Sequence, residues 1–186
     1  MNQFLPESYK VPASASGFLK FEDGDNRIRI LSRPMLGYSL WIGGKPKRVK
    51  TVEEFTENDI KNADENSYTG KKGTPNHFWA IIVWNYKEAR IQILEVTQSS
   101  IQRGIVSLTD DTDWGTPLNY DLNIARHEEN KITRYSVTPK PKKEIAPDVK
   151  QALKDTPIDL EALFYDADPY AKPAKAKAPM NENVKE

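Results

Sequence analysis

The chain of 186 residues contains no cysteine. Disulfide bonds, thiolate nucleophiles, cysteine-ligated zinc sites and iron–sulfur clusters are therefore excluded. Histidine is also scarce, with two residues, and no Gly-x-Ser-x-Gly motif is present, so a hydrolytic triad is not expected. No apolar run approaches the roughly 18 residues of a membrane span, and the first residues lack a signal-peptide pattern. We expect a cytoplasmic protein that contacts no membrane and uses no cofactor or metal.

An excess of charge of either sign is absent as well, because 27 Lys and Arg balance 27 Asp and Glu. A uniformly basic nucleic-acid-binding protein is therefore excluded. The charges are nevertheless segregated along the chain. Residues 131–143 carry five basic and no acidic residues, whereas residues 144–170 carry seven acidic and two basic ones. Such segregation lets a neutral chain present a basic face, although solvated loops of mixed charge give a similar pattern.

Apolar and β-branched runs separated by turn signals predict strands along much of the chain. We expect strands at residues 26–31, 35–42, 77–86, 89–97, 120–126 and 131–138, and a hairpin tip or a further strand at the basic stretch 45–50. Residues 98–109 place apolar side chains at helical spacing and predict one short helix packed on the sheet. The pattern favours a mainly β fold, an OB-fold-like, partly open barrel of five or six strands, and a β-sandwich fits almost as well.

The composition divides the chain into four segments. Residues 1–16 are expected to form a flexible arm, and residues 17–143 the β domain, with an insertion loop at 51–76 that carries at most one short helix. Residues 144–170 are acidic and aromatic, and predict short C-terminal helices. Residues 171–186 are rich in lysine and are expected to form a disordered tail.

Basic side chains interleave with aromatic ones on the predicted strands. Single-stranded nucleic acid binds such a mixture because cations follow the phosphates while flat rings stack on bases, each stack contributing about 1–3 kcal/mol. The candidates for this role are Arg27, Arg29, Arg33, Tyr38, Trp41, Lys47, Arg48, Lys50, Lys71, Lys72, Trp79 and Tyr86.

Two alternative interpretations apply to these candidates. Large aromatic side chains are more often buried than displayed, so each ring could belong to the core. Trp79 and Trp84 lie five residues apart in one predicted strand and therefore point to opposite faces, and we assign Trp84 to the core. The arginines could instead form ion pairs with the acidic residues 53–59 on an outer sheet face.

Taken in order, the motifs resemble the single-stranded-DNA-binding proteins of tailed phages. The segments that carry this resemblance are Phe18-Leu19-Lys20-Phe21, Gly24-Asp25-Asn26-Arg27-Ile28-Arg29-Ile30-Leu31, Gly37-Tyr38 with Trp41, His77-Phe78-Trp79-Ala80, Val83-Trp84-Asn85-Tyr86, Gln92-Ile93-Leu94-Glu95-Val96-Thr97-Gln98, Asp113-Trp114-Gly115-x-Pro117, Tyr120-Asp121 and Tyr135-x-Val137-x-Pro139. They cover roughly residues 17–165. The resemblance implies an OB fold of the helix-destabilising type, coating of single strands in phage replication and recombination in the host bacterial cytoplasm, and no catalysis.

The chain departs from better-known relatives at two places. Some relatives carry a cysteine- and histidine-ligated zinc in an insertion like residues 51–76, and a chain without cysteine cannot hold it. Many also end in an acidic tail that recruits replication or recombination proteins, whereas here the acidic segment precedes a lysine-rich end. Within that segment, Leu160, Leu163, Phe164, Tyr165 and Tyr170 are expected either to dock on such a protein or to fold back on their own domain.

Two other function classes stay open on sequence grounds. A structural or interaction β protein of the virion would need no nucleic acid, and its basic patches would merely balance acidic ones. A DNA-processing nuclease or annealing recombinase is less favoured, because the predicted core strands offer Glu95 almost alone as a carboxylate for magnesium.

Overall fold

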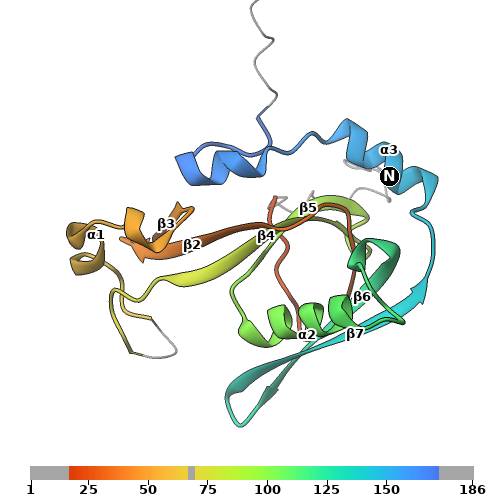
Figure 1. Cartoon of the computed structure of the whole chain (residues 1–186), viewed down its shortest axis with the longest axis horizontal. Coiled ribbons are helices and arrows are strands. Elements are labelled where there is room, and N and C mark those ends of the chain that lie inside the picture. The colour runs from red at the N-terminus through yellow and green to blue at the C-terminus, as the bar shows by residue number, and fades with distance from the viewer. Residues whose placement is uncertain (1–16, 67–69, 172–186) are drawn as a thin grey trace, which may run out of the picture.

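A computed structural model describes residues 17–66 and 70–171, so the expected arm at 1–16 and the tail beyond residue 171 lie outside the described part. Figure 1 shows a curved sheet with helices on two sides. The strands are β1 (Gly24–Ile30), β2 (Met35–Ile42), β3 (Lys45–Val49), β4 (Asn76–Asn85), β5 (Arg90–Val96), β6 (Tyr120–Glu129) and β7 (Ile132–Lys142). The α-helices are α1 (Glu57–Lys61), α2 (Ser99–Asp110) and α3 (Pro147–Asp155), and the 3-10 turns are η1 (Val52–Glu54), η2 (Pro117–Asn119) and η3 (Leu160–Tyr165).

All seven strands belong to one antiparallel sheet built around β4. One edge of β4 pairs with β5, and the other edge pairs with β2 at its beginning and with β1 at its end. The order then continues from β1 to β6 and β7, with β3 at the opposite end beyond β2. Because β3 and β7 remain separate edges, the barrel is partly open. The expected mainly β, OB-like fold is confirmed.

Of the two alternatives for the basic stretch at residues 45–50, a hairpin tip or a further strand, the strand is correct and forms β3. Gly43 and Gly44 both adopt positive φ, at 59° and 75°, which suits a tight two-residue turn between β2 and β3. The strand expected at residues 131–138 extends further, to Lys142, so that Pro139 and Pro141 lie within β7. Proline cannot donate to a ladder, and it is tolerated here because β7 is an edge strand.

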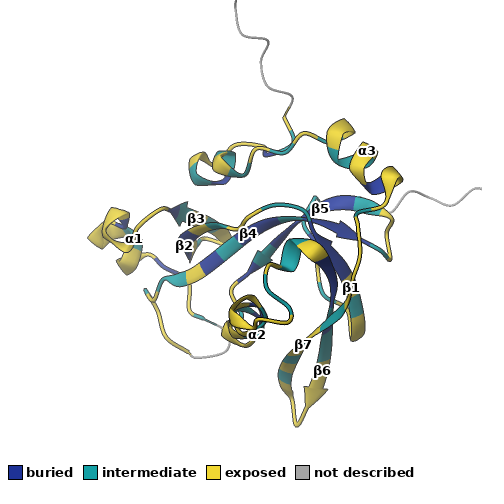
Figure 2. Ribbon diagram, turned by 45° about the vertical axis from the view of Figure 1, so that its right-hand side comes forward, coloured by how far each residue is buried: buried dark blue, intermediate teal, exposed yellow. Residues whose placement is uncertain are grey.

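The main core lies on the side of the sheet that packs against α2, here called the inner side. Ile28 of β1, Ile81 of β4 and Ile124 of β6 are buried there, and Ile101 and Ile105 of α2 cover them. Their spacing of four residues places both helix side chains on one face, which is the reason the sequence pattern predicted this helix. The buried strands and the exposed outer faces of the helices are visible in Figure 2.

The opposite, outer side of the sheet is covered by residues 144–171, here called the C-terminal segment. Val149 of α3 packs with Trp84 and Ile91, and Leu163 of η3 packs with Phe78. Burying each of these two aliphatic side chains stabilises the fold by roughly 1.5–3 kcal/mol. Figure 1 shows α3 and η3 on the side of the sheet away from α2.

The two ends of the described chain meet beside β5. The amide of Ile93 donates to the carbonyl of Gly17 at 2.9 Å, and the amide of Leu19 donates to the carbonyl of Ile93 at 2.8 Å. The hydroxyl of Tyr170 donates to the same Gly17 carbonyl. The first residues of the domain are therefore held between β5 and the C-terminal segment.

Residues 51–66 of the insertion fold back on the inner side of β2 and β3. Phe55 and Ala63 pack against Leu40 and Val49. Thr56 caps α1, because its hydroxyl accepts from the amide of Asp59 at 3.1 Å. The region contains one short α-helix, α1, as expected, and the 3-10 turn η1 in addition. None of the helices in the described residues is long and apolar enough to span a bilayer.

Candidate nucleic-acid interface

Three ring-bearing side chains form a row across β2 and β4, here called the aromatic row: Tyr38, His77 and Trp79. The strand register places Tyr38 opposite His77 and Leu36 opposite Trp79, so all four side chains share the inner side. The rings of Tyr38 and His77 lie 5.1 Å apart, centre to centre. His77 is exposed, Tyr38 and Trp79 are half-buried, and Leu36 is 52% exposed. The row therefore offers ring surface to a ligand beyond the edge of the core.

Hydrogen bonds fix the position of this row. The indole N–H of Trp79 donates to Nε2 of His77 at 3.1 Å, and Nδ1 of His77 lies 3.0 Å from the carbonyl of Gly37. An indole nitrogen can only donate, so Nε2 must accept and Nδ1 must carry the proton toward Gly37. The neutral Nδ1–H tautomer of His77 thus orients both rings before any ligand arrives.

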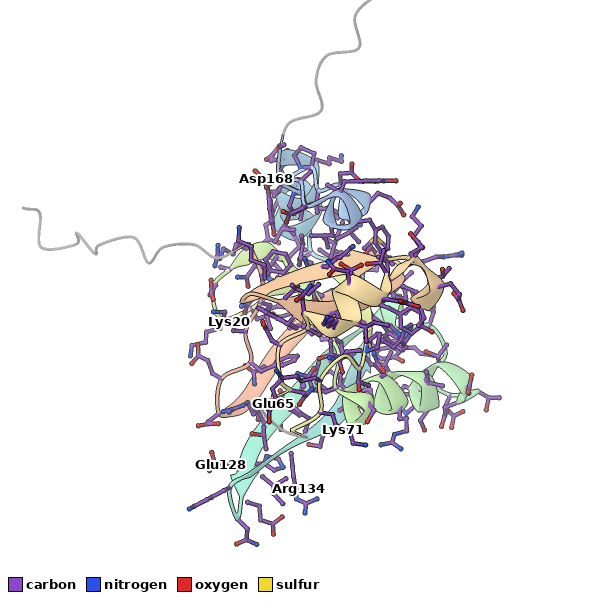
Figure 3. The ribbon with its side chains drawn as sticks, turned by 90° about the vertical axis from the view of Figure 1, so that its left-hand side faces the viewer. Lys20, Glu65, Lys71, Glu128, Arg134 and Asp168 are labelled. Carbon is purple, nitrogen blue, oxygen red and sulfur yellow. The ribbon has the colours of Figure 1, made fainter. Side chains whose placement is uncertain are left out.

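A polar groove continues from the row toward the open side of the barrel. It runs between the loop after α1, the end of β2, the beginning of α2 and the inner side of β7. Its lining consists of Leu40, Trp41, Asp64, Glu65, Asn66, Lys71, Thr74, Asn76, Thr97, Gln98, Ser99, Ser100, Thr133 and Tyr135. Figure 3 shows Glu65 and Lys71 on the loop, above the hairpin that carries Glu128 and Arg134.

Trp41 is the largest exposed side chain on this groove, with 49% of its surface accessible. A half-exposed tryptophan beside neutral hydroxyl and amide groups suits stacking on a nucleobase. One of the two groove carboxylates is already engaged, since Asp64 accepts from the amides of Gly43 and Gly44 at 2.9 and 2.8 Å. Lys72 is exposed next to Lys71 on the same loop.

The basic stretch of β3 and Lys50 lies apart from the groove, and each of its predicted DNA-binding residues pairs with a carboxylate. Lys47 bonds to Asp59 at 2.6 Å, and Arg48 bonds to Glu95 at 2.7 Å. Lys50 bonds to Glu161 of the C-terminal segment at 2.6 Å, and its ammonium lies 5.3 Å from the ring centre of Phe164. A second groove separates β3 from η3 at this place.

Arg27, Arg29 and Tyr86 gather on the outer side of the sheet around Asp121, whose side chain is fully buried. Arg29 is itself buried, and its Nε has no hydrogen-bond partner among the described residues. Burial alone would raise the pKa of Asp121, but hydrogen bonds from Arg27, Lys143, Arg29 and Tyr86 outweigh it and hold the pKa below its ordinary value. The expected pairing of arginines with residues 53–59 is therefore wrong for Arg27 and Arg29.

The sequence-predicted candidates thus occupy three places. The row and the groove contain Tyr38, Trp41, Lys71 and Trp79, and the cluster around Asp121 contains Arg27, Arg29 and Tyr86. Lys47 and Arg48 belong to β3, and Lys50 follows this strand. Arg33 is exposed in the turn after β1. Tyr135 and Lys143 were not among the predicted DNA-binding residues, although the basic run 131–143 that contains both was noted.

The leucine and aromatic residues proposed for partner binding mostly fold back on the domain. Leu160, Leu163, Phe164 and Tyr170 pack with Phe78 and its neighbours. Tyr165 is different, because 73% of its surface is accessible. Within residues 17–66 and 70–171, no three His, Asp or Glu side chains are grouped so that they could hold a metal ion.

Comparison with known proteins gives one informative match. The chain is 24% identical over 173 residues to a probable ssDNA-binding protein of Escherichia phage T5. The match covers 81% of this chain and 63% of that protein, so the chain spans less than two thirds of the length of this relative. No protein-family model matches the chain, and no solved structure matches it either.

Proposed function

We propose that this protein binds single-stranded DNA without sequence preference and coats it, as a non-enzymatic component of phage replication or recombination in the host cytoplasm. The observation that carries the proposal is the aromatic row beside a polar groove, on the side where the barrel is open. The similarity to a phage protein that is named a probable ssDNA-binding protein supports the same conclusion.

The geometry suggests how a strand would be held. Bases would stack on Trp41 and on the aromatic row, and every base has a flat face, so stacking requires no particular sequence. Lys71 and Lys72 lie on the loop at the groove and would neutralise phosphates. A duplex keeps its bases paired and stacked inside, so these rings would have nothing to contact. We therefore expect a preference for single strands.

The exposed Tyr165 beside the pairing of Glu161 with Lys50 is the place where a replication or recombination protein would contact the C-terminal segment. The remaining aromatic side chains of this segment are occupied by packing on the sheet. A partner would therefore meet η3 as a folded surface rather than as a free tail.

The proposal is tested by fluorescence anisotropy with labelled oligothymidylate and a matched duplex at two salt concentrations, with tryptophan fluorescence followed in the same titration. We expect tighter binding to the single strand, quenching of tryptophan, and weaker binding at higher salt. Equal binding to both DNAs would contradict the preference for single strands. No binding at low salt would contradict the proposal as a whole and favour the structural or interaction protein.

A further inference from the structure

Three cations surround a single carboxylate on the outer side of the sheet. Oδ2 of Asp121 accepts from Nε and Nη2 of Arg27 at 2.9 and 2.7 Å and from Nζ of Lys143 at 3.0 Å. Oδ1 accepts from Nη1 of Arg29 at 3.2 Å and from the hydroxyl of Tyr86 at 3.1 Å. The group therefore carries two positive charges more than Asp121 can balance.

Only one of the three cations is needed to hold the fold at this place. Arg29 is buried, and its Nη2 donates to the carbonyls of Leu118 and Lys143 at 3.0 and 2.7 Å. It alone would neutralise Asp121. Arg27 and Lys143 are different, because 46% and 44% of their side chains are accessible. The two uncompensated charges thus lie at the surface, where a ligand can reach them.

These two surface cations are held close together over one ring. Both lie within 3.0 Å of the same carboxylate oxygen, and the guanidinium carbon of Arg27 and the ammonium of Lys143 lie 4.4 and 5.2 Å from the ring centre of Tyr86. Like charges at this spacing repel each other, and an anion between them would relieve the repulsion. The bonds of Arg27 to Asp121 use Nε and Nη2, which leaves the two donors of Nη1 for such an anion.

Two carboxylates of the turn before β1 are already paired with other cations. Glu22 pairs with Lys87, and Asp23 pairs with Arg126. We propose that Arg27, Lys143 and the ring of Tyr86 form a binding site for a phosphate group, either from a DNA strand or from a nucleotide, on the sheet face opposite the groove. If the phosphate belongs to a DNA strand, the proposal rests on the proposed function and adds a DNA contact outside the groove.

The test follows the side-chain Nε–H signal of Arg27 by NMR while inorganic phosphate replaces chloride at constant ionic strength. We expect a saturable shift in the unaltered chain. Lys143→Gln should weaken phosphate binding at least tenfold, whereas Lys143→Arg, which keeps the charge, should restore it to within about twofold. The matched control is Lys87→Gln, which removes a more exposed cation, with 67% of its side chain accessible against 44% for Lys143, at the position after Tyr86, and it should leave phosphate binding unchanged. Thermal unfolding of each variant confirms that it is folded.

A second arm identifies the source of the phosphate. If a strand supplies it, Lys143→Gln should reduce the salt dependence of oligothymidylate binding by about 0.7 in the log–log slope. If a nucleotide supplies it, the slope is unchanged and thymidine monophosphate shifts the Arg27 signal as inorganic phosphate does. A non-saturable shift of the Arg27 signal, or an equal loss of phosphate affinity in Lys87→Gln, would overturn the phosphate-site proposal even if the protein binds DNA. Saturable phosphate binding without any DNA binding would leave the site standing and overturn the proposed function.

Discussion

Trp79 and Trp84 lie on the same strand and face opposite sides of the sheet. Trp84 is 8% exposed and packs against Val149 of α3, whereas Trp79 is half-buried and donates its indole N–H to His77. The strand alternation that separates them was predicted from their spacing, and the assignment of Trp84 to the core is confirmed. This division gives a direct way to separate stability from binding.

Trp84→Ala should destabilise the domain by about 3–5 kcal/mol, because it leaves a cavity between the sheet and α3. Trp79→Phe keeps an apolar ring but removes the bond to His77, and it should lower oligothymidylate affinity severalfold and remove much of the tryptophan quenching. Urea unfolding and anisotropy titration measure the two effects. If Trp84→Ala weakened DNA binding at unchanged stability, the side of the sheet that carries Trp84 would be the binding side.

Trp41→Ala should lower oligothymidylate affinity by about 5- to 150-fold, the loss of one stacked base at 1–3 kcal/mol. Its side chain is half-exposed, so the melting temperature should change little. Val106→Ala is the matched control, because Val106 is 45% exposed on α2 and does not line the groove. Equal losses in both variants would exclude a specific contribution of Trp41.

Lys72→Gln should weaken binding more at low salt than at high salt. Each phosphate contact on a single strand contributes about −0.7 to the slope of log affinity against log salt, so the slope should become shallower by that amount. Lys150→Gln removes an exposed lysine from α3, on the other side of the sheet, and should leave the slope unchanged. Anisotropy at four salt concentrations gives both slopes.

The carboxyl of Asp59 should titrate at an unusually low pH. A hydrogen bond from Lys47, then bonds from the amide and hydroxyl of Thr56, lower its pKa to about 2. The pKa of Asp59 in the folded state lies below its value of about 3.9 in the unfolded state, so the ionised carboxylate stabilises the fold. This contribution is complete above about pH 3.9 and is lost as the pH falls through about 2.

Lys47→Met should therefore raise the pKa of Asp59, and carbon NMR of the carboxyl measures it. The variant should also unfold at a higher pH on acid titration than the unaltered chain. Lys61→Met, on the same insertion, serves as the control and should leave the titration of Asp59 as it is. An unchanged midpoint in Lys47→Met would mean that the ion pair does not persist in solution.

Gly37→Ala should loosen the C-terminal segment. A Cβ at this position would lie 2.8 Å from the ring of Phe164 and 2.8 Å from the carbonyl oxygen of Val49, so η3 or the sheet must shift. We expect a loss of about 1–3 kcal/mol and faster proteolysis within residues 156–166. Gly115→Ala places its Cβ in open space but strains a positive φ of 63°, so it controls for general destabilisation and should not increase cleavage within residues 156–166 selectively.

The sequence predicted the strands best where local patterns decide them. Residues 76–85 are apolar on both faces and can only be a central strand, and α2 follows from the spacing of Ile101 and Ile105. The charged contacts were not predictable in this way. Arg27 and Asp121 are 94 residues apart, and only the pairing of β1 with β6 brings them together. The alternation of side chains along β1 predicted that Arg29 faces outward. It could not predict that Arg29 is buried against Asp121 and Lys143.

The meeting of Gly17 and Tyr170 beside β5 makes the domain nearly circular. Residues 153 positions apart in the chain are joined there by a hydrogen bond, and the amide of Ile93 donates to the same carbonyl. A short linker could therefore join these two points, and new ends could be opened at the exposed turn between β6 and β7, around Asn130. Such a circular permutant would keep every strand pairing across β4, and it would offer the groove and the Asp121 cluster on a chain whose ends project from the hairpin.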